Sequence, residues 1–216
     1  MMKQKRIAVL LLTAFLTVIG FSACRNSSTD TARIDANFSI GAKTDTAYSN
    51  RFFEIAFTLP DENWRFLTDE EIATSVNAIQ RELQDVDAVK TALEGNDTYF
   101  DVIALNTVDN SQINITLGRV PELSDEITTE AILDQTLTEL GSALEGMGAT
   151  NVNGARSTAT FQGGTVPITD ITFNLAGYAV YEKQVILMKG SYIATITVSS
   201  YGEDLTQQYL DQFTKP

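Results

Sequence analysis

The stretch that decides the fold is residues 178–199, which read YAVYEKQVILMKGSYIATITVS. β-Branched, aromatic and other apolar residues fill the runs 178–188 and 192–199, and Lys189-Gly190 between them is a turn signal. This combination predicts two antiparallel strands joined by a tight turn.

Strand-like runs continue upstream of this hairpin, at residues 53–59, 64–66, 100–105, 113–117, 155–161 and 168–173. Gly163-Gly164 and Ala176-Gly177 separate the last runs, so the final third of the chain is predicted to be a β-meander. In residues 112–117 apolar and polar side chains alternate, which is typical of a strand with one buried face and one polar face.

Apolar residues recur at a helical period in three further segments, residues 72–93, 133–147 and 205–213. Thr68 and Glu71 form a capping box before the first, and Ser200 and Glu203 form one before the last. The predicted order is β-β-α-β-β-α-β-β-β-β-α. This order indicates an α+β fold in which helices cover an antiparallel β-sheet.

The N-terminus predicts an export signal. Residues 1–23 contain three basic and no acidic side chains, and the apolar run at residues 7–21 is too short for a membrane span. Its end, Phe21-Ser22-Ala23-Cys24, resembles a bacterial lipobox, which implies lipidation of Cys24 and cleavage before it. The alternatives are an ordinary signal peptide with a chance Cys, a short membrane anchor and a buried helix.

Two acyl chains on Cys24 would give stable anchoring, because one chain alone binds membranes only marginally. Residues 24–46 follow as the lipidated Cys and a flexible tether, since their composition buries too little apolar area to offset chain entropy. Residues 47–216 then form a single domain. The expected location is the outer face of a bacterial cell membrane.

Composition excludes several classes of function. The chain of 216 residues has no His and one Cys, which removes His-based catalysis, His metal ligands and Cys-cluster metal sites. Its 28 acidic and 15 basic residues give a formal net charge of −13, which argues against a nucleic-acid partner. The Gly-x-Ser-x-Gly nucleophile motif is absent, so we expect no catalytic residues.

Carboxylates are the remaining candidates for chemistry. Residues 69–71 read Asp-Glu-Glu at a predicted helix start, where acids complement the helix dipole. Residues 61–63 and 109–111 are polar turns that could contribute oxygen ligands to calcium, but neither matches an EF-hand loop. The turn interpretation is favoured for both, and no cofactor or metal site is predicted.

Tyr48-Ser49-Asn50, the strand at residues 53–59, Pro60 and Asn63-Trp64 resemble the opening motif of PsbP-like and Mog1-like domains. The paired strands at residues 181–185 and 192–198 are similar to the C-terminal strands of those domains. This resemblance implies an α/β/α sandwich and a largely non-enzymatic family. Fold does not fix function, so no site residue is transferred, and Trp64 is expected to lie in the core.

Three functions remain. The leading one is a non-catalytic, lipid-anchored extracytoplasmic module that binds an unidentified envelope protein. The alternative is a small-ligand or metal-binding module. The third is a hydrolase built on two buried carboxylates that face each other across a cleft and have raised pKa values.

Overall fold

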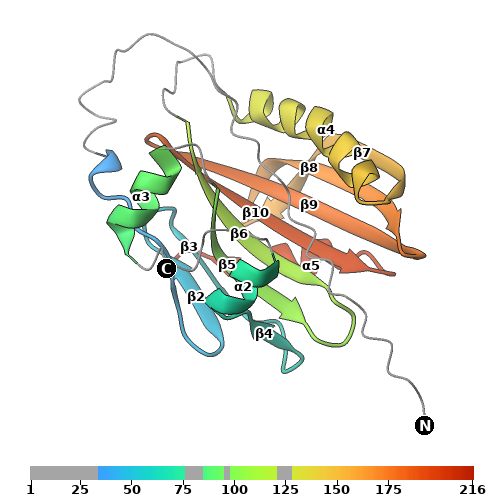
Figure 1. Ribbon diagram of the computed structural model, residues 1–216, viewed down its shortest axis with the longest axis horizontal. Helices are drawn as coiled ribbons and strands as arrows, with labels where there is room; N and C mark the ends of the chain where they lie inside the picture. Colours follow the sequence, from blue (N-terminus) through green and yellow to red (C-terminus); the bar gives the residue numbers. More distant parts are fainter. Residues whose placement is uncertain (1–33, 76–84, 95–97, 121–127) are drawn as a thin grey trace.

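The computed structural model describes residues 34–75, 85–94, 98–120 and 128–216, which form two antiparallel sheets and four helices (Figure 1). The large sheet has the strand order β4-β5-β6-β10-β9-β8-β7, and the small sheet has the order β1-β2-β3-β11. The large sheet comprises β4 (Trp64–Phe66), β5 (Tyr99–Asn106), β6 (Gln112–Arg119), β7 (Thr150–Phe161), β8 (Gly164–Leu175), β9 (Tyr178–Lys189) and β10 (Tyr192–Tyr201). The small sheet comprises β1 (Ala42–Lys43), β2 (Ala47–Asn50), β3 (Ile55–Thr58) and β11 (Phe213–Thr214). The helices are α2 (Asp69–Ser75), α3 (Val86–Glu94), α4 (Thr129–Gly146) and α5 (Thr206–Leu210).

The predicted meander is confirmed, and its turns explain why it forms. Gln162 and Gly163 have φ values of 50° and 76°, and Ala176 and Gly177 have values of 52° and 89°. Two successive residues with positive φ make the turn that matches the twist of antiparallel strands. The strands are therefore paired by local turns, and β9 and β10 remain in register from Lys189 opposite Tyr192 onward.

Different elements cover the two faces of the large sheet. On one face α4 packs on β7, β8 and β9, while Ile72 of α2 packs with Ile103 and Leu105 of β5. On the other face the main core joins the large sheet to the small sheet, α3 and α5, through residues such as Phe57 and Leu93. The α+β class and the antiparallel sheet are as predicted. The α/β/α sandwich is not confirmed, because a second sheet contributes much of the cover on one face.

The C-terminus differs from its prediction. Helix α5 ends at Leu210, and Phe213 lies in β11, which pairs with β3. The predicted capping box also differs, since Ser200 accepts a hydrogen bond from Leu205 N, while Asp204 accepts one from Thr206 N. Within the single helix predicted over residues 72–93, the structure describes α2 and α3. Residues 76–84 lie outside the described part.

The domain begins earlier than residue 47. Asp35 accepts hydrogen bonds from the backbone N (2.8 Å) and the hydroxyl (2.7 Å) of Ser191. Phe38 is buried and stacks on Tyr192 with ring centroids 3.9 Å apart. Residues 34–46 are therefore packed against the domain and are not a flexible tether. The predicted signal peptide, Cys24 and the rest of the tether lie outside the described residues.

In the part of the chain that the structure describes, no helix is long and apolar enough to cross a membrane.

Candidate functional site

A band of buried polar side chains crosses the centre of the large sheet. It comprises Gln112, Asn114 and Thr116 of β6, Thr195, Thr197 and Ser199 of β10, Glu182 and Gln184 of β9, and Thr169 of β8. We call these nine residues the polar band. None of them is more than 3% exposed. Pairing aligns them, since Thr197 lies opposite both Asn114 and Gln184, and Ser199 lies opposite both Gln112 and Glu182.

The polar band faces the side of the sheet that carries α2 and α4. Side chains two residues apart share a face of a strand. Ile193 and Ile186, which share strands and faces with Thr195 and Gln184, pack with Ile132 and Leu133 of α4. In Figure 1 α4 lies along β8 and β9 and α2 lies beside β4 and β5, with β6 and β10 between the two helices.

Most of the polar band lacks hydrogen-bond partners for its side chains. Within the described residues two bonds form, from Gln184 Nε2 to Glu182 Oε1 (2.7 Å) and from Thr169 Oγ1 to Gln184 Oε1 (3.5 Å). The atoms left without a partner there are Gln112 Oε1 and Nε2, Asn114 Oδ1, Thr116 Oγ1, Glu182 Oε2, Thr195 Oγ1 and Thr197 Oγ1.

Such atoms are unusual in a folded protein. Each buried polar group without a partner costs about 1–3 kcal/mol, whereas an apolar side chain of the same shape would cost nothing. Valine or isoleucine would fill the same strand positions. In native proteins such atoms are usually satisfied by ordered water or by a bound ligand.

Glu182 is the charged member of the polar band. Burial raises the pKa of its carboxyl group to about 7, and the hydrogen bond from Gln184 opposes this rise in part. Burial, together with the nearby Glu182 carboxyl, also raises the pKa of Tyr201 to about 12. Near neutral pH the carboxyl group is thus divided between its neutral form, which can donate, and its charged form, which accepts.

A second buried carboxylate, Asp101, ties the small sheet to the large one. It accepts hydrogen bonds from Gly41 N (2.9 and 3.0 Å), from the Tyr48 hydroxyl and from Asn50 Nδ2 (3.0 Å). Tyr48 and Asn50 belong to the stretch Tyr48-Ser49-Asn50 that resembled a family motif, so two of its side chains serve this contact. Burial, followed by the Asp101 charge, raises the pKa of the Tyr48 hydroxyl well above its usual value.

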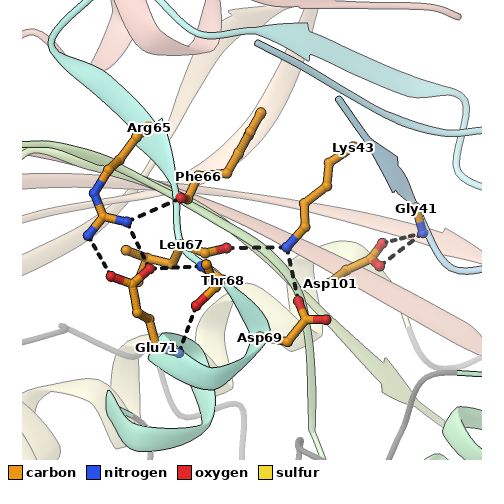
Figure 2. A network of polar contacts seen from close by, with 9 residues as sticks. All are labelled: Gly41, Lys43, Arg65, Phe66, Leu67, Thr68, Asp69, Glu71 and Asp101. Atoms are coloured by element: carbon orange, nitrogen blue, oxygen red, sulfur yellow. Dashed lines mark hydrogen bonds and ion pairs between the residues drawn. The ribbon is translucent and has the colours of Figure 1, made fainter. Parts of the chain in front are cut away.

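Ion pairs beside Asp101 hold the start of α2 (Figure 2). Lys43 Nζ contacts Leu67 O (3.2 Å) and Asp69 Oδ1 (3.0 Å). Arg65 binds both oxygens of Glu71 at 2.8 Å, and Glu71 also accepts from Thr68 N (2.9 Å), which confirms the first capping box. Arg65 and Thr68 lower the pKa of Glu71 to about 2. Asp69 and Glu71 therefore have the structural roles that were expected.

Asp101 and Glu182 do not form a catalytic pair. Asp101 contacts β2 of the small sheet, whereas Glu182 lies on the opposite face of the large sheet, toward α4. Their strands, β5 and β9, are also separated by β6 and β10. Among the described residues these are the buried carboxylates, and the facing arrangement required for the hydrolase hypothesis is not present in them.

The two polar turns at residues 61–63 and 109–111 are each closed by an internal hydrogen bond. Asp61 Oδ1 accepts from Asn63 N (2.7 Å), and Asp109 Oδ1 accepts from Ser111 N (2.8 Å). In turns, an Asp carboxylate commonly accepts a hydrogen bond from the backbone N–H two residues later. In the described residues no three His, Cys, Asp or Glu side chains gather as metal ligands. Trp64 is buried and packs edge-on against Tyr209, as expected of a core residue.

Sequence reasoning missed the polar band. The alternation of Gln112, Asn114 and Thr116 with apolar residues was interpreted as a buried face and a polar face, and the polar face proved to be buried as well. A usable signal was available in the repetition of the same pattern in residues 182–184 and 195–199. Polar positions on several adjacent strands indicate one continuous surface.

The chain was compared with known proteins. No protein-family model matches it, and no curated protein sequence matches it. The solution structure of cyanobacterial PsbP (CyanoP) from Synechocystis sp. PCC 6803 is similar at 12% identity and a TM-score of 0.47, covering 84% of this chain and 99% of that one.

A crystal structure of LpqN, described as involved in cell envelope biogenesis of Mycobacterium tuberculosis, is similar at 15% identity and a TM-score of 0.42. The similarity covers 88% of this chain and 99% of that one.

Proposed function

We propose that this chain is a lipid-anchored extracytoplasmic protein whose domain is a non-catalytic binding module for a small polar ligand. The observation that carries the proposal is the polar band, with its buried hydrogen-bonding atoms that lack partners in the described residues. A flat protein surface cannot reach side chains that are at most 3% exposed, so the occupant is small. The lipobox at Phe21-Ser22-Ala23-Cys24 supports the anchor and the location.

The polar band also limits the chemistry of the ligand. Two amide side chains and three threonine hydroxyls offer both donors and acceptors, while Glu182 offers one further oxygen. A ligand with several hydroxyl or amide groups would satisfy them. A purely apolar ligand would leave them without partners and would bind poorly.

Replacing Thr195 and Thr197 together by valine is expected to stabilise the ligand-free domain and abolish ligand retention. Each substitution keeps the side-chain shape and removes a buried hydroxyl without a described partner, which should add about 1 kcal/mol to the free energy of unfolding. Wild-type protein purified natively should carry extra mass in native mass spectrometry, and the double variant should not.

Thr206→Val is the matched control. Thr206 is equally buried, but its hydroxyl accepts from Lys183 Nζ (2.7 Å) and contacts Asp204. This variant should lose about 1–2 kcal/mol of stability and still retain the ligand. Loss of stability in the double variant, or the same retained mass in it as in the wild type, would contradict the proposed site.

Cys24→Ala is expected to release the protein from membranes, because the acyl chains are the proposed anchor. Fractionation of cells should find the wild type with the membrane and the variant in the soluble fraction, after mass spectrometry has confirmed that the leader is cleaved. A variant that stays with the membrane after cleavage would contradict lipid anchoring.

A protein partner is the second candidate, and strand β7 favours it. It lies at the edge of the large sheet, spans 12 residues and has mostly exposed side chains. An edge strand of this length can accept a strand from another chain along the part that Gln207, which donates to Thr160 O (2.8 Å), does not cover. Crosslinking in intact cells, in the wild type and in Cys24→Ala, would identify an envelope protein that depends on anchoring. Absence of a specific partner in both samples would leave the small-ligand function alone.

A further inference from the structure

A cationic hollow lies where the described chain enters the domain. It has a volume of about 340 Å³ and is lined by Ile34, Asn37, Ser39, Arg51, Phe52 and Lys189. Two of the 15 basic residues of this acidic chain face it, and its lining contains no carboxylate. Asn37 and Ser39 add polar groups, while Ile34 and Phe52 form an apolar side.

The two cations differ in how far they are already engaged. Lys189 Nζ is 2.9 Å from Glu54 Oε1 and lies 5.5 Å from the centre of the Phe52 ring. Arg51 is exposed, and no ion pair joins it to a described residue. The nearby carboxylate of Asp35 is held by Ser191. Arg51 is therefore the group with free capacity for an anion, and Lys189 can share its charge.

The position of the hollow indicates the source of that anion. Asp35 and Phe38 fix the entering chain beside the turn between β9 and β10. Cys24 precedes Asp35 by eleven residues, which span at most about 40 Å when extended. If Cys24 is lipidated, as the proposed function states, this end of the domain stays close to the bilayer.

From this geometry we infer that the hollow binds the phosphate of a membrane lipid headgroup, with Arg51 as the main contact. A guanidinium group binds phosphate oxygens in pairs, and the apolar side can receive the adjoining glycerol. The net charge of the chain does not prevent this, because salt screens exposed charges beyond about 8 Å. The contact would hold the β9–β10 end of the domain toward the membrane.

The test uses the mature chain with Cys24→Ala, so that anchoring and headgroup binding are separated. Backbone amide NMR shifts are followed during titration with dihexanoyl phosphatidylglycerol below its micelle concentration, and in parallel with inorganic phosphate. We expect saturable shifts confined to residues 34–39, 51–52 and 189–191, with weaker binding of inorganic phosphate. Arg51→Gln should weaken lipid binding about tenfold, the loss of one charged hydrogen-bonding group.

Arg156→Gln is the matched control, because Arg156 is an exposed arginine of β7 that is paired with Asp134 of α4, away from the hollow. It should bind the lipid like the parent protein. Equal binding of inorganic phosphate and lipid would overturn the assignment to a lipid headgroup. Absence of local shifts, or unchanged binding in Arg51→Gln, would overturn the site itself. Neither result bears on Cys24, whose role the fractionation experiment tests separately.

Discussion

Replacing Asp101 by alanine is expected to lower the free energy of unfolding by about 3–5 kcal/mol, because three buried or half-buried donors lose their acceptor at about 1–3 kcal/mol each. Asp101 accepts hydrogen bonds from three groups, the backbone N–H of Gly41, the hydroxyl of Tyr48 and the amide of Asn50. Its partners Tyr48 and Asn50 are at most 2% exposed, so the loss of the carboxylate leaves buried donors without their acceptor. Urea unfolding, with the midpoint compared at constant m-value, measures the change.

Two further variants separate the carboxylate from the packing around it. Asp101→Asn keeps one oxygen that can accept from Tyr48 and Asn50. It should therefore lower the free energy of unfolding by less than Asp101→Ala does. Tyr48→Phe removes one donor and keeps the buried ring, so about 1–2 kcal/mol is expected. Asn50 also donates to Ser39 O, so it keeps one hydrogen bond when Asp101 is replaced. If Asp101→Ala costs no more than Tyr48→Phe, Asp101 does not join the two sheets in the way described.

Local signals explain which parts of the fold could be predicted from sequence. Hairpins such as β9–β10 are encoded by a short turn and its flanking runs, and these were predicted close to their observed limits. Strands β1, β2 and β11 have only two to four residues, and β11 pairs with β3 from more than 150 residues away. Their formation depends on tertiary packing, which a short window of sequence does not contain.

The prediction that the domain begins at residue 47 was wrong for a related reason. Residues 34–46 are mostly small or polar, and this composition predicts a tether. A single aromatic residue, Phe38, and a single carboxylate, Asp35, hold the segment by stacking on Tyr192 and bonding to Ser191. Composition averages over a segment and does not detect two anchoring contacts. Such contacts can be identified only when the three-dimensional positions of their partners are known.

The candidate site was missed because alternation indicates which side chains share a face but not whether solvent reaches it. Thr197 has the sequence pattern of an exposed β-residue, yet it lies on β10, the middle strand of seven. Asn114 and Gln184 flank it on the adjacent strands. Strand order brings these polar positions side by side, and it depends on the pairing of β6 with β10, which are more than 70 residues apart.

Replacing Glu182 by glutamine is expected to stabilise the ligand-free domain by about 3 kcal/mol at pH 8 and to have little effect at pH 4.5. Burial raises the pKa of Glu182 from 4.5 to about 7 in the folded state, and each pKa unit corresponds to about 1.4 kcal/mol. The folded protein therefore holds this proton more tightly than the unfolded chain. Stability from this group is fully present below pH 4.5 and is lost as pH rises through 7.

Glutamine preserves the shape of the side chain and its contact with Gln184, because the amide oxygen can still accept from Gln184 Nε2. Urea unfolding of the wild type and Glu182→Gln at pH 4.5, 6 and 8 measures the difference. The raised pKa of Asp101 is present in both proteins, so its contribution cancels. A difference that stays constant across this range would show that Glu182 is not the buried, titrating group.

Glu71→Gln provides a control with the opposite sign. Arg65 and Thr68 lower the pKa of Glu71 to about 2, so its charged form stabilises the folded state. This variant should be less stable than the wild type near neutral pH, and the difference should shrink as pH falls below 4.5. Opposite pH trends in the two variants would separate a carboxylate that stabilises the fold from one kept at a cost in stability.

A natural ligand that donates to Glu182 Oε2 would reduce that cost, so the gain from Glu182→Gln should be smaller in natively purified, ligand-bearing protein than after refolding.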